Sequence, residues 1–228
     1  MVFFLCFPPD PPEKANARGA HGAEFNLYIG KQSLPNEFAL GLKDAPCAEP
    51  KCCILGTLGA PCGFTACWAR KTVLEKYGRG MDDFVCFQGY LPGCCCIQPA
   101  ACLPGSPAGL VLEGCLCPMM SLSIARIHLM DNKQIRPDPM DWQIIQYSNF
   151  LQLVSCIFSI VAAVSGKREL EEAATLLDLI ADCFTLSVGG CMAAQVHYEL
   201  NKTPVVQGMP VGTVQAVAVP VPGTIERA

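Results

Sequence analysis

Residues 142–166 read WQIIQYSNFLQLVSCIFSIVAAVSG and carry no charged side chain over twenty-five positions. As one helix this stretch would be about 37 Å long, against roughly 30 Å for the hydrocarbon core of a bilayer. Its first half contains several polar side chains, so the strongly apolar part is shorter and covers 150–164. The stretch therefore predicts a long helix, part of which faces apolar surroundings.

A second helical stretch follows at once, with the sequence KRELEEAATLLDLIADCFTLSVGGCMAAQVHYELNK at 167–202. The short Ser-Gly-Lys connection predicts that 142–166 and 168–201 form an antiparallel helical hairpin. Within the second helix, Gly189 and Gly190 predict either a bend or the close approach of a neighbour. Asp178 and Asp182 stand four positions apart and share one face of the helix, with Glu171 on the same face seven residues before Asp178. That face either is wet or lines a cavity, a cation path or a partner.

The stretch CCILGTLGAPCGFTACWA at 52–69 is also uncharged, but glycine and proline interrupt it, so one spanning helix is not expected there. We expect an amphipathic helix over 65–77 instead. Thr65 would cap its start, and Gly78 would end it in the left-handed conformation. Such a helix suits a protein core or a membrane surface.

Residues 86–117, CFQGYLPGCCCIQPAACLPGSPAGLVLEGCLC, hold seven of the sixteen cysteines and one charge, Glu113. Proline and glycine break this stretch too often for a long helix, and it lacks the charge of an ordinary exposed loop. It predicts an irregular, apolar connector that something else covers. After it, Pro118 is placed to begin a helix over 119–132.

The composition constrains the surroundings of the chain. Its 228 residues are 51% hydrophobic and only 16% charged, where soluble domains average roughly 25% charged. The net charge is −4 and no basic block is present, which argues against a nucleic-acid partner. We expect membrane lipid, subunits of a larger complex, or both as partners.

The predicted fold is mainly α. A cysteine-rich irregular centre with amphipathic helices precedes the C-terminal hairpin, and extended tails flank both. The predicted regions are an extended arm at 1–50, a cysteine-rich region at 51–141, the hairpin at 142–202 and a Val/Pro-rich extended tail at 203–228.

The start of the chain does not resemble a signal peptide, so a reducing compartment is expected and most cysteines are expected as thiols. A disulfide framework is less expected than this reduced set, although the cysteine count is even. The candidate metal ligands are Cys94, Cys95, Cys96, Cys102, Cys115 and Cys117. The metal would be zinc, and a chain without a cofactor is the alternative. No C-x2-C pair occurs, so this metal assignment is unspecific, and cysteine as a small buried hydrophobe is the alternative. A third reading is S-acylation, with Cys6, Cys52 and Cys53 as candidates.

No nucleophile–base pair, phosphate loop or paired-carboxylate signature appears in the sequence, and we expect no enzyme. His128 and His197 are lone histidines on predicted helices. We expect hydrogen-bonded interface roles for them in preference to metal ligation.

Several motifs carry a family resemblance: the adjacent pair Cys52-Cys53, the centre GCCCIQPAAC at 93–102, and the Cys-Leu-Cys-Pro at 115–118. The last leads into a helix with Arg126 and a turn, IRPDPMD, at 135–141. In these features residues 50–160 resemble the cysteine-rich family that includes placenta-specific protein eight, cornifelin and the plant fruit-weight and cadmium-resistance proteins. The resemblance covers under half of the chain. It implies a membrane-associated cysteine-rich domain and a role in ion or metal handling.

Three functions follow as hypotheses. The first is a non-catalytic, cysteine-rich, membrane-associated protein that serves as a structural or assembly subunit of a larger complex. The second is an ion- or metal-handling membrane protein that uses Asp178 and Asp182 or the thiolates of 94–117. The third is a soluble interface subunit of a large protein assembly.

Overall fold

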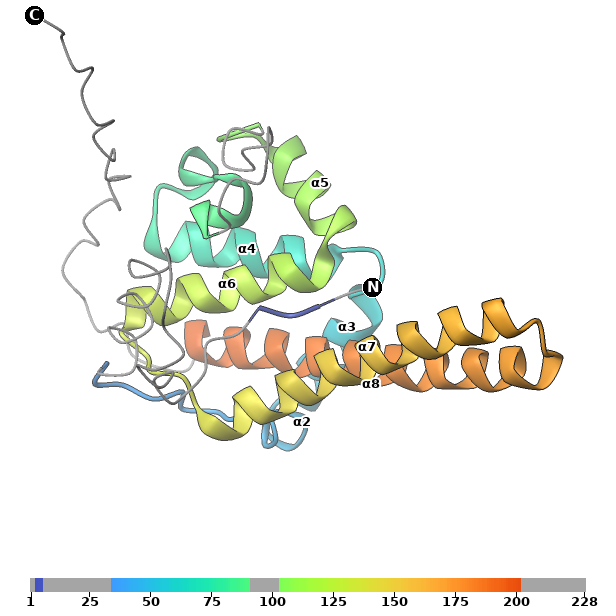
Figure 1. Ribbon diagram of the computed structural model, residues 1–228. Coiled ribbons are helices and arrows are strands. Elements are labelled where there is room, and N and C mark those ends of the chain that lie inside the picture. The colour runs from blue at the N-terminus through green and yellow to red at the C-terminus, as the bar shows by residue number, and fades with distance from the viewer. Residues whose placement is uncertain (1–2, 6–33, 91–102, 202–228) are drawn as a thin grey trace, which may run out of the picture.

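The computed structural model describes residues 3–5, 34–90 and 103–201, and the statements below concern those residues. They are 77% helical and contain no strand, which confirms the predicted mainly-α fold. The helices in chain order are α2 Ala45–Ala48, α3 Pro50–Gly59, α4 Phe64–Tyr77, the short 3-10 turns η1 Gly80–Asp83 and η2 Cys86–Gly89, α5 Pro107–Leu116, α6 Pro118–Lys133, α7 Pro139–Ser165 and α8 Arg168–Asn201 (Figure 1).

The last two helices form the predicted antiparallel hairpin, which projects from a body made of the other helices (Figure 1). Helix α7 begins three residues earlier than predicted, because the Asp138 side chain accepts a hydrogen bond from the backbone N–H of Asp141 at 2.9 Å and Pro139 takes the first helical position. Gly166 ends α7 in the left-handed conformation, with φ of 61°.

The body is built from two sharply bent helix pairs. The helix axis bends by 118° between α3 and α4, and by 118° between α5 and α6. The predicted break in 52–69 is confirmed, and the helix predicted over 119–132 is confirmed with Pro118 as its first residue. The short helices α2, α3 and α5 were not predicted, because glycine and proline in short segments usually indicate turns. Helix α2 lies within the arm predicted as extended.

Two details of the helix predicted over 65–77 are wrong. Gly63, with φ of 72°, precedes α4, and the Thr65 hydroxyl donates to the carbonyl oxygen of Gly56 at 2.7 Å instead of capping the helix. Gly78 at the other end has φ of −135° and is extended, not left-handed. The first difference follows from packing, because the sharp turn into α4 brings Thr65 against α3.

Helix α3 crosses α8 at a glycine contact. A Cβ atom added to Gly190 would lie 2.1 Å from the Thr57 hydroxyl oxygen and 2.5 Å from the Cys53 carbonyl oxygen. One added to Gly56 would lie 3.1 Å from the Gly190 Cα atom. Helix α8 continues unbroken through this point. The glycine pair therefore serves the close approach of a neighbour, one of the two predicted alternatives.

A buried polar network joins α6 to both hairpin helices. The Arg126 guanidinium donates to Asp141 Oδ2 of α7 at 2.7 Å and to Gln195 Oε1 of α8 at 2.6 Å. Gln195 Nε2 in turn donates to Asp141 Oδ2 at 2.7 Å. These three side chains are at most 5% exposed. Because buried polar groups are costly when unpaired, this network fixes how the three helices meet.

The chain before α2 is held by the same network. Backbone N–H of Leu42 donates to Asp141 Oδ1 at 2.8 Å, and the Leu40 carbonyl accepts from Gln195 Nε2 at 2.8 Å. The Arg126 guanidinium lies 4.4 Å from the centre of the Phe38 ring. The described part of the predicted N-terminal arm thus lies on the core.

A second buried ion pair stabilises the body. Arg70 Nε of α4 donates to Glu113 Oε1 of α5 at 3.1 Å, with both side chains fully buried. Glu113 also accepts from the Ser121 hydroxyl and from the backbone N–H of Phe87, each at 2.7 Å. The single charge of the cysteine-rich stretch is therefore used inside the body, not on its surface.

The glycine crossing generates a stability prediction. We expect Gly190→Ala to lower the free energy of unfolding by about 1–3 kcal/mol, because the new methyl group meets backbone that cannot move aside easily. Gly189→Ala is the matched control, since its Cβ would meet only the ends of the Met119 and Leu122 side chains, the nearest atom being the Met119 sulfur at 3.1 Å. Denaturant titration in detergent micelles, followed by circular dichroism, measures both. Equal losses in the two variants would contradict the crossing.

A pH dependence follows from His128 on α6, whose Nδ1 is buried and has no hydrogen-bond partner among the described residues. Burial, together with the charge of Arg70, lowers the pKa of His128 to about 4, against the opposing effects of Asp131 and Asp83. Between about pH 6.5 and pH 4 the unfolded chain therefore binds a proton that the folded chain does not. We expect the folded state to lose about 3 kcal/mol as the pH falls through that window.

The His128→Leu variant isolates this effect from the titration of carboxylates. Unfolding curves at pH 7, 5.5 and 4 should diverge between wild type and variant as the pH falls, with the variant losing less stability. Parallel pH profiles for the two proteins would show that His128 is not the group responsible.

Candidate functional site

The two hairpin helices face each other through polar side chains. The Ser148 and Thr185 hydroxyls lie 3.0 Å apart, and Gln152 Nε2 donates to Thr185 Oγ1 at 3.0 Å and to Asp182 Oδ1 at 2.9 Å. Further along, Asp178 accepts hydrogen bonds from the hydroxyls of Ser155 and Ser159 on α7. The Ser159 hydroxyl oxygen lies 3.0 Å from Asp178 Oδ2. We call this set the polar seam: Ser148, Gln152, Ser155 and Ser159 of α7, with Asp178, Asp182 and Thr185 of α8.

The spacing of the polar seam explains how it forms. On α7 its members follow one another at intervals of four, three and four residues, and on α8 at four and three. This is the spacing that turns one stripe of each helix toward its partner in a coiled coil. Small buried residues, Ala162, Ala174 and Ala181, lie beside it. The helices thus associate through hydrogen bonds and small side chains, as helices in a bilayer do.

The outward faces of the hairpin are apolar. Val164 is 84% exposed, and eight further large apolar side chains of the projecting part are between 42% and 59% exposed. We call this set the apolar sleeve: Phe150, Leu153, Ile157, Ile160, Val161, Val164, Leu176, Leu179 and Ile180. A hairpin that folds in water places such residues between its helices and polar ones outside, so this hairpin has the reverse pattern.

Both hairpin helices are long and apolar enough to cross a membrane, judged by length and composition. With 27 and 34 residues they are about 40 and 51 Å long. Their connection carries Lys167 and Arg168, and Glu169, Glu171 and Glu172 follow in the first turns of α8. The tip of the hairpin is therefore charged, whereas the apolar sleeve behind it is not.

The predicted carboxylates lie at the edge of the polar seam. Asp178 and Asp182 share one face of α8 as predicted, and both are exposed at their outer side while their oxygens accept hydrogen bonds from α7. Glu171 lies closer to the tip and is exposed.

The predicted cysteine sites are only partly within the described residues. Cys94, Cys95, Cys96, Cys102 and Cys6 lie outside them. Cys115 is exposed, Cys117 and Cys52 are half-buried, and Cys53 is buried against α8. In the part of the chain that the structure describes, no group of three or more His, Cys, Asp or Glu side chains is placed to hold a metal ion. The metal and S-acylation assignments stay predictions.

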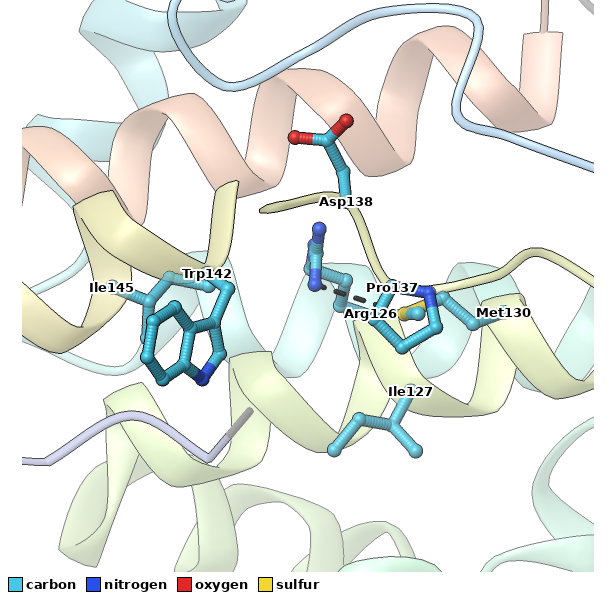
Figure 2. Close-up of a pocket in the computed structure, with 7 residues that line it drawn as sticks. All are labelled: Arg126, Ile127, Met130, Pro137, Asp138, Trp142 and Ile145. Atoms are coloured by element: carbon cyan, nitrogen blue, oxygen red, sulfur yellow. Dashed lines mark hydrogen bonds between the residues drawn. The ribbon is translucent and has the colours of Figure 1, made fainter. Parts of the chain in front are cut away.

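A small pocket lies between α6 and the start of α7. Figure 2 shows Arg126 inside it, with Met130 and Pro137 on one side and Trp142 and Ile145 on the other. Arg126 is occupied by the buried network, and its Nη1 also lies 3.7 Å from the Met130 sulfur. The pocket therefore offers packing around a paired charge, not a cation free to bind substrate.

The polar seam and the buried network were not predicted from the sequence. The seam had a visible signal, because serine and glutamine recur on α7 at four- and three-residue intervals. The network had none, since Arg126, Asp141 and Gln195 are brought together only by the packing of three helices.

Comparisons of the chain with family models, with curated proteins and with solved structures give no match. The resemblance of residues 50–160 to the placenta-specific-eight family stays a prediction.

Proposed function

We propose that this protein is a non-catalytic, membrane-associated protein whose α7–α8 hairpin is inserted in a lipid bilayer. In this proposal the helical body, α2–α6, is held at the membrane surface as a structural or assembly module of a larger complex. The observation that carries the proposal is the reversed pattern of the hairpin, with its polar seam inside and its apolar sleeve outside.

The energetics of the hairpin favour lipid over water. The nine side chains of the apolar sleeve are about half exposed, and covering them would contribute roughly 10 kcal/mol, since fully burying one such side chain contributes about 1.5–3 kcal/mol. Two carboxylates at membrane depth cost roughly 5–7 kcal/mol together on insertion scales. Hydrogen bonds from Ser159 and Gln152 to Asp178 and Asp182 offset part of that cost. The backbone of both helices is already hydrogen-bonded internally, as a bilayer requires.

The length of the hairpin also suits a crossing. Gly189 lies against Met119 at the start of α6, so this level of α8 still belongs to the body. Helix α8 begins at Arg168, twenty-one residues earlier, which corresponds to about 32 Å. This distance is close to the roughly 30 Å of the hydrocarbon core. The charged tip would then reach the head groups of the far leaflet.

Carbonate extraction of membranes that contain the full-length chain tests this proposal. We expect the wild type to stay in the membrane pellet. The double variant Ile157→Lys with Leu179→Lys should move largely to the supernatant, because each lysine costs roughly 2.5–3.5 kcal/mol at membrane depth. Both positions are exposed, so the polar seam is left intact.

The matched control adds the same two charges to exposed positions of the molecule outside the apolar sleeve, as Ala48→Lys with Asn201→Lys. We expect it to remain in the pellet with the wild type, and circular dichroism should show equal helix content in all three proteins. Full release of the wild type without detergent would overturn the proposal and favour a soluble interface subunit.

A second candidate function, ion handling, is favoured by one observation: Asp178 and Asp182 place two carboxylates on the apolar hairpin, each bonded to α7 on one side and exposed on the other. We expect Asp178→Asn with Asp182→Asn to abolish any cation flux in proteoliposomes while membrane insertion is kept. Ser187→Ala, on the exposed surface of the same helix, is the control. Flux that is unchanged in the double variant removes this candidate in its carboxylate form.

A further inference from the structure

The corners of the two bent helix pairs touch each other. The first elbow, residues 60–63, joins α3 to α4, and the second elbow, at Cys117, joins α5 to α6. The Cys115 thiol donates to the Cys62 carbonyl oxygen at 3.7 Å. A Cβ atom added to Gly63 would lie 2.2 Å from the Gly114 carbonyl oxygen, so the two backbones are in direct contact there. The two elbows therefore form one continuous feature.

Contacts along α8 place both elbows on the side of the body from which the hairpin emerges. Helix α6 runs parallel to α8, since Met119 lies against Gly189, Arg126 against Gln195 and Lys133 against Glu199. The start of α6, and the second elbow with it, is thus the end nearer the hairpin tip.

Helix α3 runs antiparallel to α8. Its beginning lies by His197, which is 3.9 Å from Glu49, and its later residue Gly56 lies against Gly190. The end of α3, and the first elbow with it, therefore also lies toward the tip. Figure 1 shows both corners at the base of the projecting hairpin.

The surface around the elbows is apolar and uncharged. We call it the elbow surface, and its exposed members are Ile54, Leu55, Leu58, Phe64, Val111, Leu112 and Leu116. Leu58, Phe64 and Leu116 are each about 70% exposed. Residues 52–69 contain no charge, and the one charge of α5, Glu113, is buried against Arg70. The elbow surface is thus free of the charges that a water-exposed surface carries.

Several backbone groups in and beside the first elbow have hydrogen-bond partners within the chain. The Gly63 N–H donates to the Ala60 carbonyl at 3.1 Å, the Thr65 hydroxyl donates to the Gly56 carbonyl, and the Cys62 carbonyl accepts from Cys115. Irregular backbone enters a bilayer only where its polar groups have such partners. This bend can therefore leave water at low cost.

From these observations we propose that the elbow surface is a second lipid contact, which enters the near leaflet of the bilayer that the hairpin crosses. The proposal rests on the proposed insertion of the hairpin. The occupant is the acyl-chain region of that leaflet, because both elbows lie at the end of the body from which the hairpin emerges, about one hydrocarbon thickness, 32 Å, from the charged tip. When Lys167 and Arg168 reach the far head groups, the elbows lie at the near edge of the hydrocarbon.

Tryptophan reporters in the full chain, reconstituted in phosphatidylcholine vesicles with brominated acyl chains, test the elbows and the hairpin separately. Phe64→Trp reports on the elbow surface, Ile157→Trp on the apolar sleeve, and Glu75→Trp on the wet side of α4 as the control. Each signal is compared with wild type, in which Trp68 and Trp142 set the baseline. We expect bromine to quench the added fluorescence of the first two reporters at least twofold more than that of the control.

The outcomes separate this inference from the proposed function. Quenching at 157 without quenching at 64 overturns the elbow contact and leaves the inserted hairpin standing. Quenching at 64 alone overturns the inserted hairpin, and with it the elbow surface as a second contact with the bilayer that the hairpin crosses. Absence of quenching at both positions overturns both proposals. Quenching at position 75 equal to that at position 64 also overturns the elbow contact, since the body would then contact lipid on all sides and not through the elbow surface.

Discussion

The hydrogen-bonded contact of Arg126 with Asp141 and Gln195 determines how the rest of this molecule is arranged. A buried guanidinium is costly unless its charge and its donors are matched. Here one carboxylate and one amide, from two different helices, supply the match. The network therefore joins α6, α7 and α8 at one level, and the segment around Leu40 and Leu42 completes it. Lys133 and Glu199 repeat the arrangement at the far end of α6, at 2.9 Å.

This constraint gives the hairpin a fixed relation to the body. The polar seam alone would leave the two helices free to tilt together, because its hydrogen bonds join α7 to α8 and do not orient the pair relative to the body. The buried network anchors the base of α7 through Asp141 and that of α8 through Gln195. The glycine crossing of α3 at Gly190 adds a second fixed point on α8. As a result, the start of the projecting hairpin and the two elbows lie at one level of the molecule.

The sequence predicts the elements of this fold better than its contacts. The hairpin could be predicted because an uncharged run, a short connection and a second helical run leave few alternatives. The helices α3 and α5 could not, since glycine and proline in short segments usually indicate turns and only tertiary packing shows that they are helical here. For Gly190 the sequence predicts either a bend or the close approach of a neighbour. It could not decide between them, because the neighbour that needs the space, α3, was not expected.

The cysteine-rich composition does not indicate where the cysteines lie in the folded chain. Among the described cysteines, Cys53 is buried against α8, while Cys62 and Cys115 lie at the elbow contact. Cys53 lies on α3, Cys62 in the first elbow and Cys115 on α5, and of these three only Cys53 is buried. A pattern of spacings along the chain cannot reveal this, since the distance between thiols depends on how the two elbows meet.

The elbows and the hairpin have the same physical origin. In each, polar groups are satisfied by neighbouring parts of the chain: serines with Asp178 in the hairpin, backbone carbonyls with Thr65 and Cys115 in the elbows. Apolar side chains are then left to face outward. A chain that folds in water has the opposite pattern, because water itself hydrogen-bonds to exposed polar groups, whereas the exposure of apolar side chains to water is unfavourable. The hairpin and the elbows are far apart in sequence, but both lie on one side of the buried network, and both expose apolar side chains while their polar groups are paired. A chain of low charge needs this arrangement if one side of it meets an apolar phase.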